Sequence, residues 1–165
     1  MLKDLSGKIF TPLYSKGNKF GLDEGGKNGS FYALTDTFVI VPKKGVSLRF
    51  LLGILNSKLM NFHNENFGKL KRDGYYEYSR NTLSKFPIKI IDFSSKQEKA
   101  LHDKMINLVD RMLELNKQLP QAKTDHDRTT LQRQIDATDK QIDKLVYELY
   151  DLTEEEIKIV EGINL

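Results

Sequence analysis

The 165-residue sequence contains no cysteine, so it can form neither a disulfide framework nor a metal site with thiolate ligands. This absence fits a reducing cytoplasm, the localisation that we expect. No apolar run approaches the roughly 18–20 residues needed to span a bilayer, and the N-terminal segment has no hydrophobic signal region. We therefore expect a cytoplasmic protein that does not enter a membrane.

Histidine is scarce, and the three histidines are isolated from one another and from carboxylates at metal-ligand spacing. We interpret His63, His102 and His126 as surface or cap residues and expect no metal site. A sequence this poor in histidine and lacking cysteine also gives no basis for a Ser–His–Asp or Cys–His arrangement. We expect no catalytic residues in this chain.

A weak alternative concerns Asp23 and Glu24, which precede Lys27 in a segment that faintly resembles a nuclease carboxylate–lysine cluster. The Glu–Lys spacing is one residue too long for that motif, and the surrounding glycines favour a turn. These glycines do not match a phosphate-binding loop either. An enzyme with a metal-dependent nuclease site is therefore the least favoured interpretation.

Charge is distributed unevenly along the chain, although the net charge is only +3. Residues 1–92 carry fifteen Lys and Arg against eight Asp and Glu, a net charge of +7. Residues 93–165 carry eleven against fifteen, a net charge of −4. A basic front half beside an acidic back half predicts a polyanionic partner for the front half.

The front half has the pattern of a small mixed domain. Strands are expected over 8–14, where Pro12 favours an edge or a bulge, around 20–22, over 31–41 and over 88–91. Apolar residues at spacings of three and four predict one helix from Ser47 to Phe62, capped by Ser47: Leu48, Leu51, Leu52, Leu55, Leu59 and Phe62. A second short helix is expected after Ser79, ending at Pro87.

The back half is predicted to be helical. Two heptad-like series, Leu101 to Leu119 and Leu131 to Leu152, are joined by a polar loop after Pro120, which predicts an antiparallel helical hairpin. Thr138 is the polar position within the second series. Thr153 and Glu156 form a capping box that starts a third, short helix before Gly162.

The functional signal is a basic, aromatic segment that we expect to be a polar loop between the two helices of the front half. Lys and Arg neutralise phosphates, and Tyr can stack on bases or bond to the backbone. Seven such residues lie within the twelve positions from Lys69 to Arg80, although Tyr76 or Tyr78 could instead point into the core. The glycine-rich segment could add a second wall. The candidate DNA-binding residues are Lys69, Lys71, Arg72, Tyr75, Tyr76, Arg80, Lys16, Lys19 and Asn28.

Four segments together resemble the C-terminal target-recognition region of TaqI-like and type IIG restriction–modification enzymes and related N6-adenine DNA methyltransferases. They are FGLDEGG (20–26), LLGILNSKLMNF (51–62), GYYEYSRNTLSKFPI (74–88) and QIDKLVYELYDLTEEEIKIVEG (141–162). Asp151 stands where that family often has glycine, which bears on the geometry of the helix end there. Type I specificity subunits, which join a recognition domain to a long helix, are a near relative.

The resemblance implies a specificity module without its own catalytic site. In that family a methyltransferase domain carrying S-adenosylmethionine and an N-P-P-Y-type tetrapeptide precedes the recognition domain, and this chain contains neither. We therefore expect no cofactor here, double-stranded DNA as partner, and an adenine methyltransferase domain or subunit as a second partner. The family's base-reading residues lie in variable loops, so none is carried over.

The sequence thus predicts an α+β protein: a mixed α/β target-recognition domain over 1–92, followed over 93–165 by a coiled-coil-like helical hairpin that acts as spacer or docking element. We expect a monomer or a weak dimer through the helices. The alternative is a protein–protein interaction module that acts through the hairpin, with an incidental basic surface.

Overall fold

The computed structural model describes residues 7–25, 36–43 and 45–163. The chain divides into two compact units between Ile88 and Lys89, whereas the sequence analysis placed the boundary between residues 92 and 93. The first unit contains two small antiparallel sheets and short helices, and the second unit contains helices. The predicted α+β class is confirmed.

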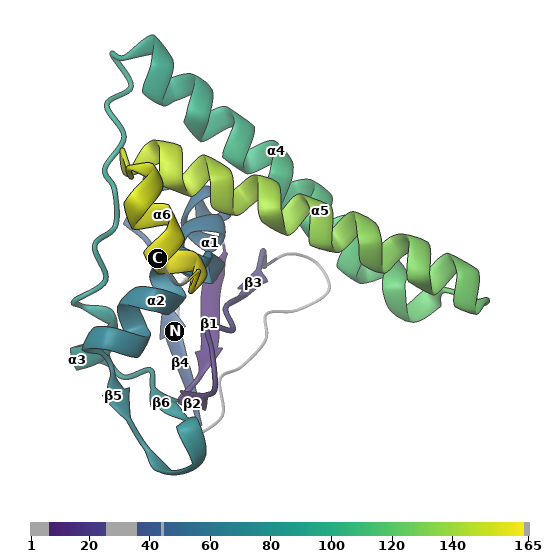
Figure 1. The fold of residues 1–165 in the computed structure, drawn as a ribbon, viewed down its shortest axis with the longest axis horizontal. Coiled ribbons are helices and arrows are strands. Elements are labelled where there is room, and N and C mark those ends of the chain that lie inside the picture. Colours follow the sequence, from purple (N-terminus) through teal and green to yellow (C-terminus); the bar gives the residue numbers. More distant parts are fainter. Residues whose placement is uncertain (1–6, 26–35, 44, 164–165) are drawn as a thin grey trace. The chain divides into compact units, whose positions relative to one another are not determined.

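The first sheet of the first unit has three antiparallel strands in the order β3-β1-β4 (Figure 1). These are β1 (Lys8–Pro12), β3 (Gly21–Asp23) and β4 (Thr37–Ile40). Ile9 pairs with Leu22 on one side and Ile40 on the other, and its side chain is fully buried. The strands fall in segments predicted to be extended, although residues 31–35 of the third segment lie outside the described residues.

Pro12 ends β1, the central strand of this sheet, and it pairs only with Thr37 of β4, because the pairing of β1 with β3 covers Lys8 to Phe10. One side of β1 is thus unpaired at Pro12, which is the edge-type position that the sequence predicts for it. The next residue, Leu13, donates its N–H to the carbonyl oxygen of Asp36 at 2.8 Å and accepts from the N–H of Tyr78 at 2.8 Å. Leu13 thereby connects the first sheet to the second.

The second sheet has the order β2-β6-β5, with β2 (Tyr14–Ser15), β6 (Tyr76–Glu77) and β5 (Lys69–Leu70). Where a polar loop was expected from residue 69 to residue 78, the structure shows a short β-hairpin instead. The third strand of the sheet, β2, pairs with β6 and follows directly after β1 in the chain. Residues some sixty positions apart therefore meet in this sheet.

The predicted helix from Ser47 to Phe62 is two helices, α1 (Leu48–Asn56) and α2 (Lys58–Phe67). Ser57 separates them because its backbone is extended and its hydroxyl donates to the carbonyl oxygen of Ile54 at 2.7 Å while accepting from the N–H of Met60 at 3.3 Å. The break changes the buried face. Met60 and Asn64 are buried, whereas the predicted core residues Leu59 and Phe62 are only half-buried. The predicted cap, Ser47, does accept from the N–H of Phe50.

The short helix α3 (Arg80–Leu83) follows Ser79 and ends before Pro87, as predicted. Ser79 occupies the cap position, but its side chain makes no capping bond to the helix backbone; its hydroxyl lies 3.5 Å from that of Thr82. The strand predicted over 88–91 is absent, and these residues are irregular. Lys89 donates its backbone N–H to the hydroxyl of Tyr150 at 3.0 Å, a bond within the second unit. The chain thus enters the second unit earlier than the sequence indicated.

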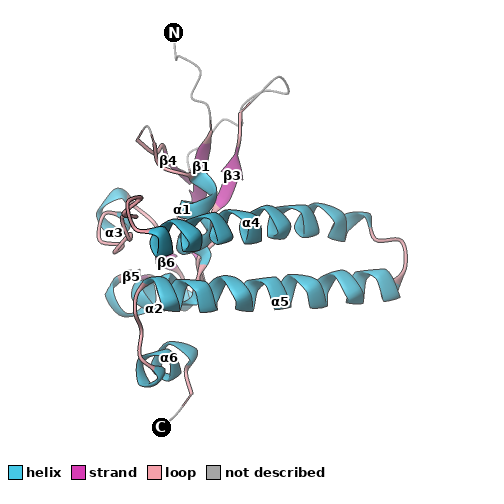
Figure 2. Cartoon of the chain, turned by 90° about the horizontal axis from the view of Figure 1, so that it is seen from above, coloured by secondary structure: helices cyan, strands magenta, loops and turns pink. Residues whose placement is uncertain are grey.

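The second unit consists of two long helices and a short one: α4 (Lys96–Gln118), α5 (Asp125–Leu149) and α6 (Glu154–Glu161). A 3₁₀ turn, η2 (Leu119–Gln121), reverses the chain, and α4 and α5 lie antiparallel side by side (Figure 2). None of the helices in the described parts of the chain is long and apolar enough to cross a membrane. The predicted helical hairpin is confirmed.

The predicted apolar series of α4 and α5 face inward. Met105 and Leu108 of α4, and Ile142 and Leu145 of α5, are buried. Thr138, the polar member of the series, is 1% exposed, and its hydroxyl donates to the carbonyl oxygen of Gln134 at 2.8 Å. This intrahelical bond satisfies the hydroxyl, so the residue fits the packed seam without a partner on α4.

The end of α5 turns through Asp151, whose φ of 53° lies in the left-handed region that favours glycine. Aspartate is among the residues that tolerate this region best, which explains how it replaces the glycine common in the resembled family. The predicted capping box of α6 is present, because Thr153 and Glu156 each accept from the other's backbone N–H. Gly162, with φ of 70°, ends α6 as predicted.

Replacing Ile142 by Asp should unfold or separate the helical hairpin, because it places an unpaired carboxylate in the seam. We expect a loss of at least about 3 kcal/mol in the free energy of unfolding, measured by denaturant titration of helical circular dichroism. Gln141→Asp, at the neighbouring exposed position, is the matched control and should leave the stability nearly unchanged. Equal stability of the two variants would show that the seam is not buried.

Candidate nucleic-acid interface

The basic, aromatic segment is organised by the β5–β6 hairpin, whose turn is set by the sequence Asp73-Gly74. Tyr75 donates its N–H to the carbonyl oxygen of Arg72 at 3.2 Å, and both residues between them have positive φ, 59° and 75°. This is the pattern of a type I′ turn, for which Asp-Gly is a preferred pair. The hairpin could therefore have been predicted from this dipeptide, which the sequence analysis overlooked.

Two candidate lysines of the hairpin share one carboxylate. Oε2 of Glu77 lies 3.2 Å from Nζ of Lys69, its cross-strand neighbour, and 2.8 Å from Nζ of Lys71. These ammonium groups lower the pKa of the Glu77 carboxyl to about 2, and the carboxylate in turn raises the pKa of Lys71. Glu77 was not among the predicted site residues, because acidic side chains repel phosphates and were not selected.

Strand β2 and the residue that follows it bring Tyr14 and Lys16 to the hairpin. Nζ of Lys16 lies 5.3 Å from the centre of the Tyr75 ring, and Nζ of Lys71 lies 5.8 Å from the centre of the Tyr14 ring. Each pair joins the β2 segment to the hairpin by a cation–π contact. The structure thus places Lys16 beside the hairpin, while Tyr14, which is 46% exposed, is a residue that the sequence analysis missed.

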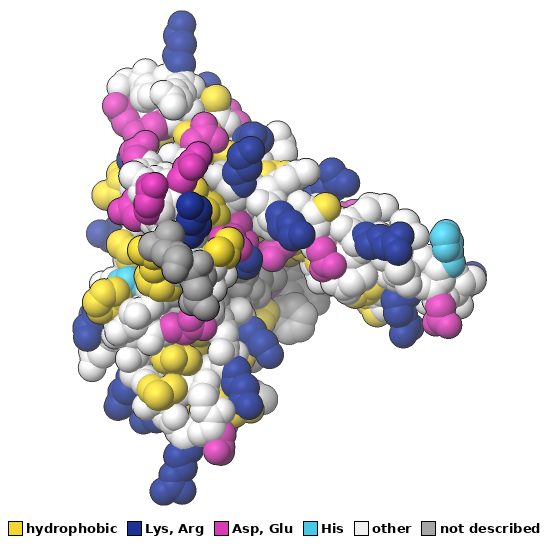
Figure 3. Space-filling model, in the orientation of Figure 1, with side chains coloured by type: hydrophobic (Ala, Val, Ile, Leu, Met, Phe, Trp, Pro, Cys, Tyr) yellow, Lys and Arg dark blue, Asp and Glu magenta, His cyan; other side chains and the backbone are white. Residues whose placement is uncertain are grey.

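The outer surface of the hairpin remains accessible. Arg72 and Tyr75 are exposed and Tyr76 is half-buried, and no ion pair holds Arg72 among the residues that the structure describes. Leu70 is also exposed. Figure 3 shows basic side chains gathered over the end of the first unit where Figure 1 places β5 and β6, with hydrophobic side chains between them. We call this surface, made by Lys16, Lys69, Lys71, Arg72, Tyr14 and Tyr75, the hairpin surface.

Tyr78 anchors the hairpin from inside, which resolves the choice between Tyr76 and Tyr78 as core residue. Its side chain is fully buried, its ring meets that of Phe20 edge-on at 5.8 Å between centres, and its hydroxyl donates to Oδ1 of Asn18 at 2.9 Å. Burial raises the pKa of Tyr78 to about 12. Tyr78 is therefore a neutral hydrogen-bond donor under ordinary conditions.

Asn18 links this anchor to the helices. Its side-chain amide donates to the carbonyl oxygen of Leu55 at 2.7 Å, and its backbone N–H donates to Oδ1 of Asn61 at 3.0 Å. The neighbouring candidate Lys19 is exposed on the same segment. The remaining candidate of this region, Asn28, lies outside the described residues.

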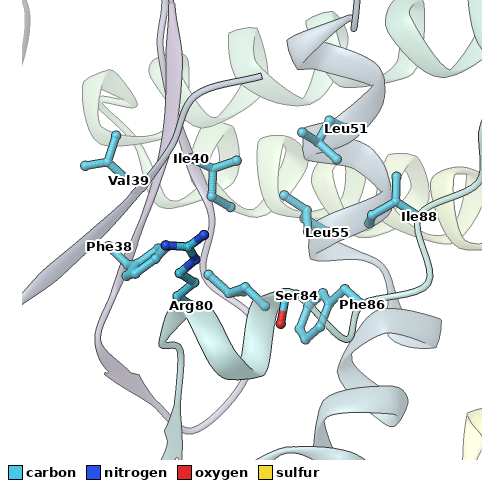
Figure 4. Close-up of a pocket in the computed structure, with 10 residues that line it drawn as sticks. Phe38, Val39, Ile40, Leu51, Leu55, Arg80, Ser84, Phe86 and Ile88 are labelled. Atoms are coloured by element: carbon cyan, nitrogen blue, oxygen red, sulfur yellow. The ribbon is translucent and has the colours of Figure 1, made fainter. Parts of the chain in front are cut away.

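Arg80 lines a different surface, an apolar pocket of about 380 Å³ between β4, α1 and the α3 region (Figure 4). Figure 4 shows its side chain beside Phe38 and Ile40, with Leu51 and Leu55 of α1 on the far side of the pocket. Of the candidates that the structure describes, Lys16, Lys69, Lys71, Arg72 and Tyr75 come together. Tyr76 lies half-buried in β6, and Arg80 and Lys19 belong to other parts of the first unit.

The carboxylates considered for a nuclease site are engaged in ion pairs. Asp23 is buried and lies 3.2 Å from Nζ of Lys8, and Glu24 pairs with Arg49. Across the described ranges no group of three His, Asp or Glu residues is arranged to hold a metal ion. His63 is half-buried within α2 and packs its ring against Phe67 and Phe86, whereas the sequence indicated a surface or cap residue.

A basic hairpin held on a small mixed sheet-and-helix unit is an arrangement suited to presenting side chains to a partner. The chain belongs to the TaqI-like C-terminal specificity domain family, which it matches over residues 5–88, about half of its length. The resemblance inferred from the sequence is thus confirmed, and the matched region ends where the first unit ends.

The similarity to one restriction–modification enzyme extends through both units. The chain is similar to the type II restriction enzyme and methyltransferase RM.Eco57I of Escherichia coli, with 25% identity over 169 residues. The alignment covers 97% of this chain and 16% of that protein. The chain therefore spans about a sixth of the length of this relative, whose name states both a restriction enzyme and a methyltransferase.

Replacing Tyr78 by Phe should destabilise the first unit by about 1–2 kcal/mol, because the side-chain oxygen of Asn18 loses its buried donor. Tyr75→Phe removes the same hydroxyl from an exposed ring and serves as control, with a change below about 0.5 kcal/mol. Thermal and denaturant unfolding followed by tyrosine fluorescence would measure both. A Tyr78→Phe variant as stable as the control would remove this bond from the anchor.

Proposed function

We propose that this chain is a sequence-specific recognition module for double-stranded DNA in a bacterial-type restriction–modification system, and that it is not itself an enzyme. The observation that carries the proposal is the hairpin surface, where three lysines, an arginine and two exposed tyrosines converge from segments far apart in the sequence. Membership of a specificity-domain family supports the same role. Phosphate contacts by the basic residues would set the register, and loop side chains at base edges would supply specificity.

The exposed turn of the hairpin supports binding in a groove. β-Ribbons can enter the major groove of B-DNA, and Arg72 is exposed at the first position of the type I′ turn. Arginine can donate two parallel hydrogen bonds to the O6 and N7 atoms of guanine, the commonest base-specific contact. Lys19, Asn28 and Arg80 remain candidate contacts outside the hairpin surface.

The second unit is proposed to dock onto an adenine methyltransferase domain or subunit. Among the described residues of this unit, Ile90, Phe93, Ile159 and Ile163 are exposed apolar side chains that a partner could cover. In this proposal S-adenosylmethionine is bound by the methyltransferase. The pocket of about 380 Å³ in the first unit does not fit this cofactor, because none of its described lining residues is acidic and could pair with the sulfonium or the ribose hydroxyls.

We place the protein in the cytoplasm, as a monomer or a weak dimer through α4 and α5. The alternative function, an interaction module that works through the helical hairpin alone, shares the exposed apolar residues of the second unit. The two functions differ in the hairpin surface, which only DNA recognition requires. Selection from a randomised duplex pool by the purified chain, followed by sequencing, separates them: an enriched short motif supports DNA recognition, and no binding at low salt contradicts it.

The double variant Lys71→Ala/Arg72→Ala should weaken duplex binding at low salt and reduce the slope of log K against log salt by about one unit for each phosphate that the variant no longer neutralises. Fluorescence anisotropy over a salt series measures both quantities. Arg133→Ala/Lys140→Ala, which removes the same charge from exposed positions of α5, is the control and should retain the wild-type slope. An unchanged slope in the first variant would exclude these two residues from the interface.

A further inference from the structure

Glu77 is the acidic residue that lies within the strands of the basic hairpin, and its contacts set it apart from a solvated surface acid. Its side chain is 15% exposed, while those of its partners Lys69 and Lys71 are 63% and 36% exposed. The carboxylate is therefore held beneath two lysines that extend further into solvent. The pairing of Lys69 with Glu77 across the strands fixes this arrangement in the backbone.

The hairpin contains a second acid that provides a natural comparison. Asp73 lies in the exposed turn, and the described part of the chain offers it no ion pair. The two acids contribute the same charge to the hairpin, and only Glu77 is joined to the lysines. A difference between their effects would therefore come from the ion pairs and not from the net charge.

A lysine that is paired with a carboxylate must exchange that partner to bind a phosphate. The exchange costs the energy of the ion pair, and the released carboxylate attracts a cation from solution, which offsets part of the gain from counterion release. Both effects weaken binding wherever Lys69 and Lys71 must contact phosphates. The ratio of specific to non-specific binding rises if the target complex is held by base contacts from other residues and leaves these two lysines paired with Glu77.

We infer that Glu77 is a specificity-determining residue: it holds Lys69 and Lys71 in ion pairs that DNA phosphates must displace, and so suppresses binding to non-target duplexes. This inference rests on the proposed DNA-recognition function. The low pKa of Glu77 is consistent with it, since the carboxylate stays charged at every pH at which duplex DNA is intact. Protonation cannot release the lysines; a competing phosphate can.

The test compares Glu77→Gln with Asp73→Asn, each of which removes one negative charge from the hairpin while keeping the size of the side chain. Asparagine suits the left-handed backbone of residue 73, so the control preserves the turn. Binding is measured by fluorescence anisotropy over a salt series, on a duplex carrying the motif selected by the wild type and on a scrambled duplex. Thermal unfolding verifies that the variants are folded.

We expect Glu77→Gln to bind the scrambled duplex about tenfold more tightly, with a salt slope steeper by about one to two units, while binding to the motif changes less. Asp73→Asn should change both affinities by less than about threefold. Equal effects of the two variants on the scrambled duplex would overturn the inference, because net charge alone would explain them. Weaker binding by Glu77→Gln would also overturn it, since Glu77 would then support the DNA contacts.

A double-mutant cycle adds an independent measurement. In a Lys69→Gln/Lys71→Gln background, Glu77→Gln should affect the scrambled duplex no more than Asp73→Asn does, because the lysines that it controls are gone. A persistent tenfold effect would contradict the mechanism. If the wild type binds no duplex at any salt concentration, the proposed function fails and the inference fails with it; if the wild type selects a motif and the variants do not differ, only the inference fails.

Discussion

The hydrogen bonds of Asn18 hold together the parts of the first unit on which the hairpin surface depends. The side chain of Asn18 accepts from the buried hydroxyl of Tyr78 and donates to the last turn of α1. Its backbone N–H donates to Asn61 of α2. The hairpin itself has strands of two residues each, and such a short ladder contributes little stability alone. Its position is therefore set by Tyr78 below it and by the Leu13 carbonyl beside it.

The break between α1 and α2 at Ser57 also helps to hold the segment that contains Asn18. A continuous helix would carry Leu59 and Phe62 on the face of Leu51 and Leu55, as the periodicity of the sequence predicts. Ser57 ends α1 at Asn56, whose side chain bonds to both backbone groups of Phe20 at 2.9 Å. Segment 17–20 can then cross the helix junction with the backbone N–H of Asn18 and both backbone groups of Phe20 satisfied. The sequence contains the serine, and nothing in its spacing shows that its hydroxyl replaces a helical hydrogen bond.

The features that the sequence predicted correctly depend on local physics. Capping by Ser47 and the Thr153–Glu156 box need only neighbouring residues, and the seam of α4 and α5 repeats over many turns. The hairpin was missed although its Asp-Gly turn is also local, because the basic residues around it resembled a solvated loop. The central place of β1 in its sheet could not be predicted, since the order of strands in a sheet depends on the whole chain.

The residues of the candidate site likewise fall into those close together in the sequence and those that only the fold brings together. Lys69, Lys71, Arg72 and Tyr75 were found together because they are close in sequence, whereas Tyr14 joins them only through the pairing of β2 with β6. That pairing also explains why Arg80, although near in sequence, faces the apolar pocket: α3 begins after the hairpin has returned to the core at Tyr78.

The hairpin surface contains charges of both signs, which affects how a small basic module discriminates between ligands. Lysines on long, flexible stems bind any polyanion, and their affinity grows with each phosphate neutralised, whatever the base sequence. A carboxylate fixed among them lowers that general affinity without touching a base. The tyrosines add a second restraint, because Lys16 and Lys71 each lie over an aromatic ring that also competes for the ammonium group. In the proposed DNA-recognition function, Arg72, the first residue of the turn and outside these pairs, is the cation best placed to contact a base edge, so the arrangement would separate general attraction from recognition within one short hairpin.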